Sequence, residues 1–253
     1  MATTTAHDVI PTHVTSVVRA ERLGERYVRV TFGGGLERFR PVGPDQFVYV
    51  LVPPPGCDVL AVDTGFRWSD HERIPAPVRP VGAYYTVRAH RPEAGELDVD
   101  VHLHEPAGHG STWAAGARAG DRAALWGPRT AWAPPDGTTR WLLVADESGL
   151  PAVEAVLDAL PAAADVTALV EVGDPAGVAH VDRPEVTWVE PGALAAAVRR
   201  LALDPAGLYA WGGAESGVMA QVRRHLRDVL GLAQEQVSMT AYWRRSSAAA
   251  IGR

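Results

Sequence analysis

The periodicity of the apolar residues changes once along this chain, and that change constrains the fold more than any single motif does. In the first half the apolar residues recur with a period of two, most clearly over residues 96–104. Beyond residue 140, short strands made of apolar residues alternate with helical patterns. The first pattern is typical of a small antiparallel barrel, and the second of a buried parallel sheet covered by helices. The sequence therefore predicts an N-terminal antiparallel β-barrel followed by a doubly wound parallel-sheet α/β domain.

The individual elements follow from the same patterns. Barrel strands are expected near residues 14–18, 27–32, 46–52, 84–89 and 96–104, and strands of the second half near residues 141–145, 166–172, 186–189, 208–211 and 237–243. Apolar residues at helical spacing predict helices through Leu150 to Leu160, Leu194 to Leu201 and Val218 to Val229. The turn-forming run Pro134-Pro135-Asp136-Gly137 predicts the boundary, with domains of residues 1–138 and 139–253.

Composition excludes several classes of function. The net charge of −6 argues against a nucleic-acid partner, and every basic residue is arginine, so no lysine can form a Schiff base. Cys57 is the only cysteine, which rules out a disulfide framework or a cysteine-based metal site within one chain. The N-terminus lacks the apolar core of a signal peptide, and no apolar run reaches about 18 residues. We expect a cytoplasmic monomer that does not enter a membrane.

The strand over residues 82–88 ends with Tyr85 followed by Thr86. One large class of flavoproteins holds the isoalloxazine ring in this way, with an aromatic face against the ring and a small donor near its N5 atom. Tyrosine and threonine are also ordinary strand residues, so the pair alone proves little. It gains weight from the segments that follow it along the chain.

Two segments after the alternating strand could bind a ligand. Residues 108–113 open a short helix, and glycine beside a helix N-terminus suits a phosphate; the alternative is a capped helix start with Ser111 as the N-cap. His102 and His104 share a strand face near His109, and Glu105 could complete a metal site. Histidines exposed on a strand are commoner, and we expect no metal.

In the second half, two loops lie where parallel strands end, which is where open α/β sheets bind ligands. Residues 145–151 join one strand to a helix, and residues 208–215 include a pair of glycines that allows close approach to a ligand. Neither is an established phosphate-binding motif, and helix capping by acidic residues is the alternative for residues 146–148. The chain then reaches Tyr242-Trp243-Arg244-Arg245, which could cover an aromatic cofactor, hold an anion, or simply form a solvated basic strand end.

Together these segments resemble the siderophore-interacting protein family of FAD-dependent, NAD(P)H-using ferric-siderophore reductases, which is related to the ferredoxin reductases. The resemblance runs from about Val14 to Arg245. It is carried by four sets of residues: 45–48 with 53–56, 85–88, 145–152, and 211–215 with 242–245. It implies FAD in the barrel, NADPH or NADH on the α/β domain, and hydride transfer to the flavin followed by single-electron transfer to Fe(III) in a chelate.

The resemblance also implies roles for individual residues. Tyr85, Thr86 and Trp243 would be the catalytic residues around the flavin, with the C-terminal tail closing over it. The residues implied to bind FAD are Tyr85, Thr86, Val87, Arg88, His102, Leu103, His104, Gly108, Gly110, Ser111, Thr112 and Trp113. Those implied to line the nicotinamide-nucleotide side are Asp146, Glu147, Ser148, Gly212, Gly213 and Glu215. Tyr49, Arg244 and Arg245 would meet the substrate.

Two positions depart from the family pattern. The family usually has arginine where this chain has Ala83, and that arginine would clamp the FAD pyrophosphate; Arg79 or Arg88 could replace it. The family often has lysine at the position of Tyr49, which is associated with anionic siderophores. Two alternatives to a ferric-siderophore reductase therefore stay open. One is a flavoenzyme of this fold that acts on another organic compound in a biosynthetic pathway, and the other is a ligand-binding protein without flavin redox activity.

Overall fold

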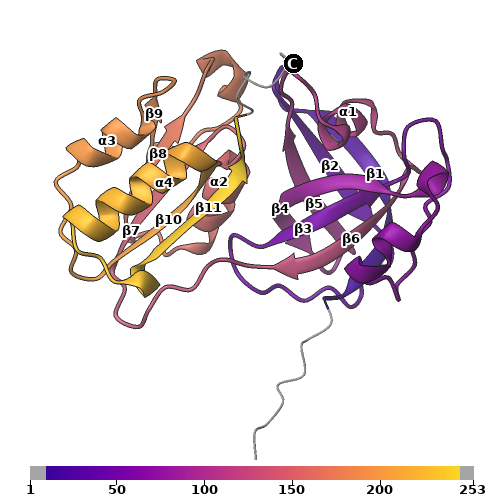
Figure 1. The fold of residues 1–253 in the computed structure, drawn as a ribbon, viewed down its shortest axis with the longest axis horizontal. Helices are drawn as coiled ribbons and strands as arrows, with labels where there is room; N and C mark the ends of the chain where they lie inside the picture. Colours follow the sequence, from indigo (N-terminus) through magenta and orange to yellow (C-terminus); the bar gives the residue numbers. More distant parts are fainter. Residues whose placement is uncertain (1–9, 246–253) are drawn as a thin grey trace, which may run out of the picture. The chain divides into compact units, whose positions relative to one another are not determined.

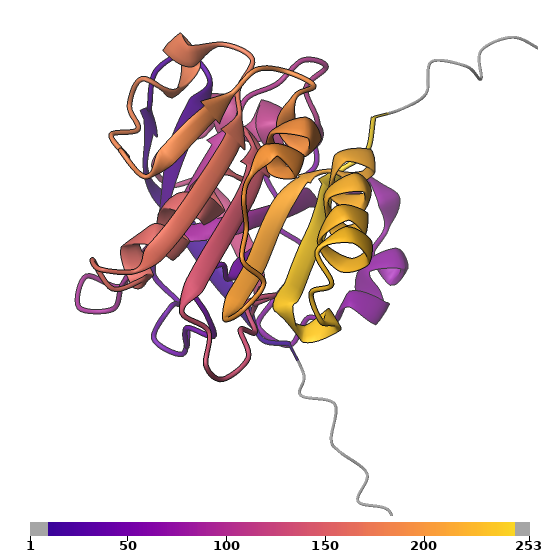
Figure 2. The same cartoon turned by 90° about the vertical axis from the view of Figure 1, so that its left-hand side faces the viewer.

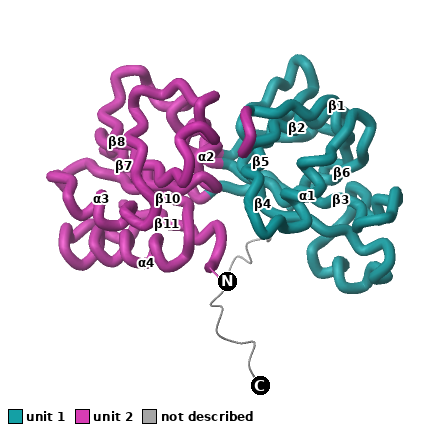
Figure 3. Tube along the Cα trace, turned by 90° about the horizontal axis from the view of Figure 1, so that it is seen from above, with its two compact units in different colours: residues 1–23, 27–42, 46–130 teal, residues 24–26, 43–45, 131–253 magenta. Residues whose placement is uncertain are grey.

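The computed structural model describes residues 10–245 and divides them into two compact units. The first unit comprises the described residues up to 23, together with 27–42 and 46–130. The second comprises residues 24–26, 43–45 and those from 131 onward (Figure 3). The family-like motifs of the barrel fall in the first unit except for Asp45, which belongs to the second, and those of the α/β half fall in the second.

The first unit is a closed antiparallel barrel, as the period-two pattern predicts (Figure 1). Its strands are β1 (Thr12–Arg22), β2 (Tyr27–Gly33), β3 (Phe47–Val52), β4 (Val81–Arg91), β5 (Glu96–His102) and β6 (Arg122–Arg129). They close in the order β1-β2-β5-β4-β3-β6. The short helices η1 (Trp68–Arg73) and η2 (Ala76–Val78) lie between β3 and β4, and α1 (His109–Gly116) lies between β5 and β6.

The inward face of each barrel strand supplies the core. Phe32, Val50, Leu97, Val99 and Leu125 come from four different strands and are at most 2% exposed. Their alternation along the chain is what the barrel requires, since successive side chains of a strand point to opposite faces. Helix α1 contributes Ala114 to the same core, so its position against the barrel is fixed by packing.

The outward face of β5 is buried as well, which the alternation alone does not reveal. Asp98 and Asp100 are only 3% and 4% exposed. Arg29 pairs with Asp100 through two hydrogen bonds of 2.7 Å, and Arg91 pairs with Asp98 through two of 2.6 Å. Thr31 donates a further hydrogen bond to Asp98. These partners compensate the cost of burying the two carboxylates.

The second unit is a parallel sheet of five strands in the order β11-β10-β7-β8-β9, as predicted. The strands are β7 (Arg140–Asp146), β8 (Asp165–Glu171), β9 (Val186–Val189), β10 (Leu208–Glu215) and β11 (Val237–Trp243). The helices are α2 (Leu150–Ala159), η3 (Pro175–Val178), α3 (Leu194–Arg200), α4 (Ser216–Arg224), η4 (His225–Val229) and η5 (Gln234–Gln236). Helices α3 and α4 cover one face of the sheet and α2 the other (Figures 1 and 2).

The last long helix differs from its predicted form. Helix α4 ends at Arg224, and the chain continues through η4, a π-helical turn. Wider turns shift the facing of later residues, so Leu226 is buried whereas Val229 is 71% exposed. The expectation that Val229 lies on the apolar face is therefore wrong.

The chain enters the second unit along a segment that is anchored by hydrogen bonds. The backbone N–H of Ala131 donates to Asp45, and that of Ala133 donates to the Tyr209 hydroxyl at 3.0 Å. Asp45, 2% exposed, also accepts a 2.8 Å hydrogen bond from the Trp211 indole. Buried polar groups with partners of this kind hold a segment in place. The boundary between residues 138 and 139 stays a prediction.

Candidate functional site

Tyr85 and Thr86 lie on β4, opposite Val48 and Phe47 of β3. Thr86 is buried, and Tyr85 packs partly against the barrel core. Burial raises the pKa of the Tyr85 phenol, so the hydroxyl stays protonated and can donate a hydrogen bond at neutral pH. The pair therefore presents a fixed aromatic ring next to a hydroxyl-bearing residue, the arrangement on which the flavin interpretation rests.

The N-terminus of α1 lies beside Tyr85. A Cβ atom placed on Gly110 would fall 2.1 Å from the Tyr85 hydroxyl oxygen, so the phenol occupies the space that a side chain would need. Gly108 is the N-cap residue, and no described side chain caps the helix. Ser111 lies within the first turn and is 5% exposed. The alternative of a helix capped by Ser111 is therefore wrong, and the backbone N–H groups of the first turn stay available to an anion.

These features fit an FAD. A Cβ atom on Gly108 would meet no heavy atom within 4 Å, so the space beside this N-cap residue is open. An uncapped helix start attracts a pyrophosphate, and an adjacent aromatic ring suits an isoalloxazine. Among the predicted residues, Gly108, Gly110, Ser111, Thr112 and Trp113 belong to this helix and its cap, while Tyr85, Thr86, Val87 and Arg88 are consecutive on β4.

Arg79 does not replace the family arginine that is missing at Ala83. The Arg79 guanidinium donates to a Glu72 carboxylate oxygen, to the Glu72 carbonyl and to the Ile74 carbonyl, at 2.9 to 3.0 Å. These bonds hold the segment between β3 and β4 and occupy the donors that a pyrophosphate would need. Arg88 is on β4, two residues beyond Thr86, and is the remaining arginine of the motif.

The two predicted histidines do not share a strand. β5 ends at His102, so His104 lies in the segment that follows, and the two rings are 6.2 Å apart. The His102 ring packs against Tyr27 at 5.1 Å, and Leu103 packs against the barrel core. Within residues 10–245, no group of three or more His, Cys, Asp or Glu side chains is placed to hold a metal ion.

In the second unit, Asp146 organises the carboxyl ends of the strands. Its Oδ1 atom accepts from the backbone N–H and the hydroxyl of Ser148 at 2.9 and 2.5 Å. Its Oδ2 atom accepts from the Glu215 backbone N–H at 3.0 Å and from the Trp243 indole at 2.7 Å. Four donors thus converge on one carboxylate, and three of the predicted residues are brought to it: Ser148, Glu215 and Trp243.

Glu215 is the N-cap of α4 and satisfies that helix start itself. One of its oxygens accepts from the backbone N–H groups of Gly217 and Val218, and the other accepts from Ser216 and from the Arg245 backbone. A carboxylate already occupies the positive end of the helix, so α4 does not offer its N-terminus to a phosphate. Capping of the following helix by residues 146–148, the alternative for that segment, is wrong, because α2 begins after Gly149 and no side chain of the described residues caps it.

The glycines of β10 allow tight packing. A Cβ on Gly213 would fall 2.6 Å from the Tyr242 ring, and one on Gly149 would fall 2.1 Å from the Gly213 carbonyl oxygen. Gly212 is equally enclosed, with Met239 and the Val144 carbonyl at 2.6 and 2.8 Å from a built Cβ. These glycines allow β10, the turn before α2 and the C-terminal residues to pack closely. The glycines are therefore required for packing, whether or not a ligand also lies against them.

Sequence reasoning missed a surface of aromatic side chains around Tyr49. The Tyr49 hydroxyl donates to the Gly82 carbonyl, and its ring contacts those of Tyr84 and Trp68 at 4.7 and 4.8 Å. Tyr84 and Trp68 are 49% and 40% exposed. The guanidinium of Arg129 lies 4.8 Å from the centre of the Tyr84 ring and also over Phe47 and Trp126. The sequence carries no signal for this surface, because its members come from β3, β4, β6 and η1 and meet only when the barrel closes.

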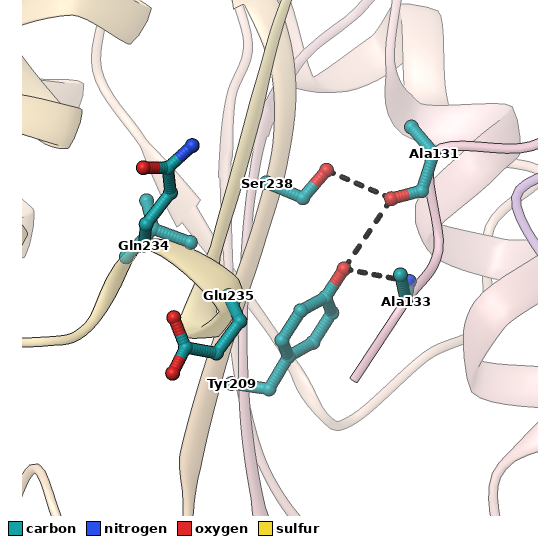
Figure 4. Close-up of a pocket in the computed structure, with 7 residues that line it drawn as sticks. Ala131, Ala133, Tyr209, Gln234, Glu235 and Ser238 are labelled. Atoms are coloured by element: carbon teal, nitrogen blue, oxygen red, sulfur yellow. Dashed lines mark hydrogen bonds between the residues drawn. The ribbon is translucent and has the colours of Figure 1, made fainter. Parts of the chain in front are cut away.

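A separate pocket of about 510 Å³ lies in the second unit, at the amino ends of β10 and β11 (Figure 4). The hydroxyls of Tyr209 and Ser238 both donate to the Ala131 carbonyl, at 3.3 and 2.9 Å. None of the predicted site residues lines it. Because ligands of open α/β sheets bind at the carboxyl ends of the strands, this pocket is not the candidate site.

Comparison with known proteins decides the family. Residues 16–132 match the model of the siderophore-interacting FAD-binding domain, and residues 138–246 match that of the siderophore-interacting protein. The chain belongs to the siderophore-interacting protein family. It is 32% identical to the uncharacterized protein Rv2895c of Mycobacterium tuberculosis over 93% of this chain and 91% of that protein.

Two further relatives connect the family to function and fold. The NADPH-dependent ferric-chelate reductase of Escherichia coli is 28% identical, with 90% of this chain and 91% of that protein covered. The crystal structure of a siderophore utilization protein from T. fusca has 28% identity and a TM-score of 0.79, with 94% of both chains covered. Family membership makes this chain an FAD-binding protein related to oxidoreductases. No helix within residues 10–245 is long and apolar enough to cross a membrane.

Proposed function

We propose that this protein is an FAD-dependent NAD(P)H oxidoreductase that reduces Fe(III) in a ferric siderophore or a related chelate. The observation that carries the proposal is the uncapped N-terminus of α1 beside Tyr85, in a chain whose first unit matches an FAD-binding family. When bound, FAD supplies the exchange between two-electron and one-electron chemistry that Fe(III) reduction by a nicotinamide requires.

The chain's own residues have binding and positioning tasks in this proposal. The α1 backbone N–H groups hold the pyrophosphate, and Tyr85 and Thr86 position the ring. Arg88, His102 and His104 support the same cofactor. The NADPH or NADH side is assigned to Asp146, Glu147 and Ser148 with Gly212, Gly213 and Glu215. The proposal takes a small-molecule chelate as the partner, a single chain as the working unit and the cytoplasm as the compartment.

We assign the positive charge that attracts the chelate to three arginines, Arg129, Arg244 and Arg245. Tyr49 carries no cation, but Arg129 lies over the aromatic rings next to it, and Arg244 and Arg245 are exposed at the C-terminal end of the described chain. Ferric siderophore chelates are often anionic, so exposed cations would favour their approach at low ionic strength. Arg129 was not among the residues that the sequence pointed to.

The double variant Arg244→Ala/Arg245→Ala tests this assignment. It should raise KM for an anionic ferric chelate and weaken the dependence of the rate on salt, because long-range attraction is screened. Arg199→Ala/Arg200→Ala removes the same charge from the end of α3 and is the matched control. A double variant with wild-type KM at low salt would show that these two residues are not part of the substrate site.

The aromatic surface favours one alternative function. Tyr49, Tyr84 and Trp68 offer ring faces and edges where relatives often have a cation, which suits a planar organic acceptor that carries less negative charge. In that case the protein would be a flavoenzyme of a biosynthetic pathway. Reoxidation of the reduced flavin by ferric chelates, measured against planar organic acceptors such as quinones, separates the two functions.

A further inference from the structure

Carboxylates gather where β7 and β8 end. The two strands are hydrogen-bonded neighbours, and Asp146 of β7 lies in register with Glu171 of β8. Glu147 follows Asp146 directly, and Asp174 follows β8 at the start of η3. This edge is the part of an open α/β sheet next to the point where the strand order reverses, between β7 and β10.

Glu147 and Asp174 both lie next to Gly173, which is exposed. Burial raises the pKa of the Glu147 carboxyl; Arg26 and the backbone N–H of Gly173, which donates to Glu147, oppose that shift, and the negative charge of Asp174 adds to it. Asp174 accepts a 3.0 Å hydrogen bond from the Ala176 backbone, which fixes its orientation. Glu171 is engaged elsewhere, since its Oε2 atom accepts from the Leu194 backbone at 3.2 Å. Glu147 and Asp174 are the two acids next to Gly173, and both are partly exposed.

The arginines of this unit that could have met a phosphate here are engaged. Arg183 pairs with Asp158, and Arg223 donates to the Met239 carbonyl. Arg26 packs its aliphatic stem against Gly177, and its charge acts on Glu147. An anion placed beside Gly173 would therefore lie near the carboxylates of Glu147 and Asp174. The charge of Arg26, the nearby cation, already acts on Glu147.

We propose that Glu147 and Asp174 select a nicotinamide nucleotide without a 2′-phosphate, so that NADH is the preferred hydride donor. This inference rests on the proposed function, which assigns a nicotinamide nucleotide to this edge. In doubly wound folds an acidic residue near the end of the second strand accepts a hydrogen bond from the ribose 2′-hydroxyl, whereas an arginine there accommodates a 2′-phosphate. Asp174 follows β8, the second strand of this unit, and Glu147 follows the neighbouring first strand β7. A 2′-phosphate beside Glu147 and Asp174 meets like charge, and like charge discriminates between partners by repulsion.

The test is a calorimetric titration of the full chain, supplemented with FAD, with two redox-inactive fragments. ADP-ribose and 2′-phospho-ADP-ribose differ only in the phosphate. We expect ADP-ribose to bind about tenfold more tightly, the effect of one unfavourable charge contact of ordinary size. The wild-type ratio needs no variant, so it does not depend on how well a substituted chain folds.

Variants then assign the preference to the two acids. Glu147→Gln/Asp174→Asn keeps size and the N-cap of η3, since asparagine caps as well as aspartate. It should reduce the ratio by about threefold or more. The control Asp228→Asn/Glu235→Gln removes two exposed acids elsewhere in the unit and should leave the ratio unchanged. An unchanged ratio in the first variant would overturn the assignment to these residues.

Two outcomes separate this inference from the proposed function. Tighter binding of 2′-phospho-ADP-ribose, lost on Arg26→Ala, would show that Arg26 clamps the phosphate and would overturn the inference alone. If neither fragment binds, the nicotinamide-nucleotide part of the proposed function fails, and this inference fails with it.

Discussion

The indole nitrogen of Trp243 donates a hydrogen bond of 2.7 Å to Oδ2 of Asp146. The two residues end β11 and β7, which are not neighbours, because β10 lies between them. The Glu215 backbone at the end of β10 donates to the same oxygen. One carboxylate therefore ties together the carboxyl ends of three strands, and it fixes the point from which the chain leaves the sheet.

Trp243→Phe should loosen that end of the chain without unfolding the unit. The substitution keeps an aromatic ring but removes the donor, and a partly exposed hydrogen bond to a carboxylate contributes about 1 kcal/mol. Trypsin cleavage after Arg244 and Arg245 should then be about fivefold faster, since cleavage follows the population of the open form. Trp188→Phe, at a tryptophan that is 37% exposed, is the control. Equal cleavage rates in both variants would mean that the bond to Asp146 does not hold the tail.

Gly110→Ala should weaken FAD binding. The new Cβ atom would fall 2.1 Å from the Tyr85 hydroxyl, so the phenol must move, and an overpacked contact costs on the order of 1–3 kcal/mol. Gly116→Ala is the matched control on the same helix, because a Cβ atom there meets nothing within 4 Å. The measurement is the dissociation constant of FAD from the fluorescence of the released flavin. Equal affinity in the two variants would separate Tyr85 from the flavin site.

Ala83→Arg should increase FAD retention during purification. The family usually has arginine here, and a charged hydrogen bond to a phosphate contributes on the order of 1.5–3 kcal/mol, or roughly ten- to a hundredfold in affinity. Arg79→Ala should instead loosen the segment around η1, since Arg79 is bonded to Glu72 and Ile74. Loss of FAD in Arg79→Ala, with no gain in Ala83→Arg, would mean that the pyrophosphate is held by Arg79 after all.

Acidification should destabilise the barrel through His13. This residue is 3% exposed, and burial lowers its pKa, although hydrogen bonds to the Gly35 and Gly127 backbones partly oppose the shift. In the unfolded chain the ring takes up a proton near its ordinary pKa of about 6.5, whereas the folded protein keeps it neutral to lower pH. Stability is therefore lost as pH falls below about 6.5, by up to about 1.4 kcal/mol per pH unit for one proton.

Urea unfolding of wild type and His13→Gln at pH 7 and at about pH 5.5 measures this contribution. The difference between the two pH values should shrink in the variant. It should not vanish, because burial also lowers the pKa of His90. A wild-type pH dependence in His13→Gln would show that His13 does not carry the effect.

The fold could be predicted from the sequence because each half has a single, consistent period. Leu97, Val99 and Val101 alternate on β5 and all lie in the barrel core, and the apolar run of β7 is buried on both faces as a parallel strand requires. Burial of Asp98 and Asp100 could not be predicted, because it depends on Arg91 and Arg29, which lie on other strands. The exposure of Val229 depends on a π-helical turn that the periodicity does not encode.

For the candidate site, the sequence indicated which segments contribute but not which contacts their individual residues make. Residues 108–113 and Tyr85 could be selected from glycine and aromatic patterns, yet their contact at Gly110 depends on how α1 packs on the barrel. Asp146 and Glu215 were selected as ligand residues, and the structure gives both a large share of internal hydrogen bonds. Arg129 was missed because its contacts with Phe47 of β3 and Tyr84 of β4 depend on how the barrel closes.

The central claim is that the protein carries FAD and passes electrons from a nicotinamide nucleotide to a ferric chelate. The most direct test is to load the purified chain with FAD, add one equivalent of NADH or NADPH per flavin without oxygen, and then mix it with a ferric siderophore in the presence of a ferrous-specific chelator. We predict that the yellow absorbance of the oxidised flavin bleaches and then returns, with about two Fe(II) trapped per flavin. A protein that takes up no FAD, or whose reduced flavin is not reoxidised by ferric chelates, would contradict the account.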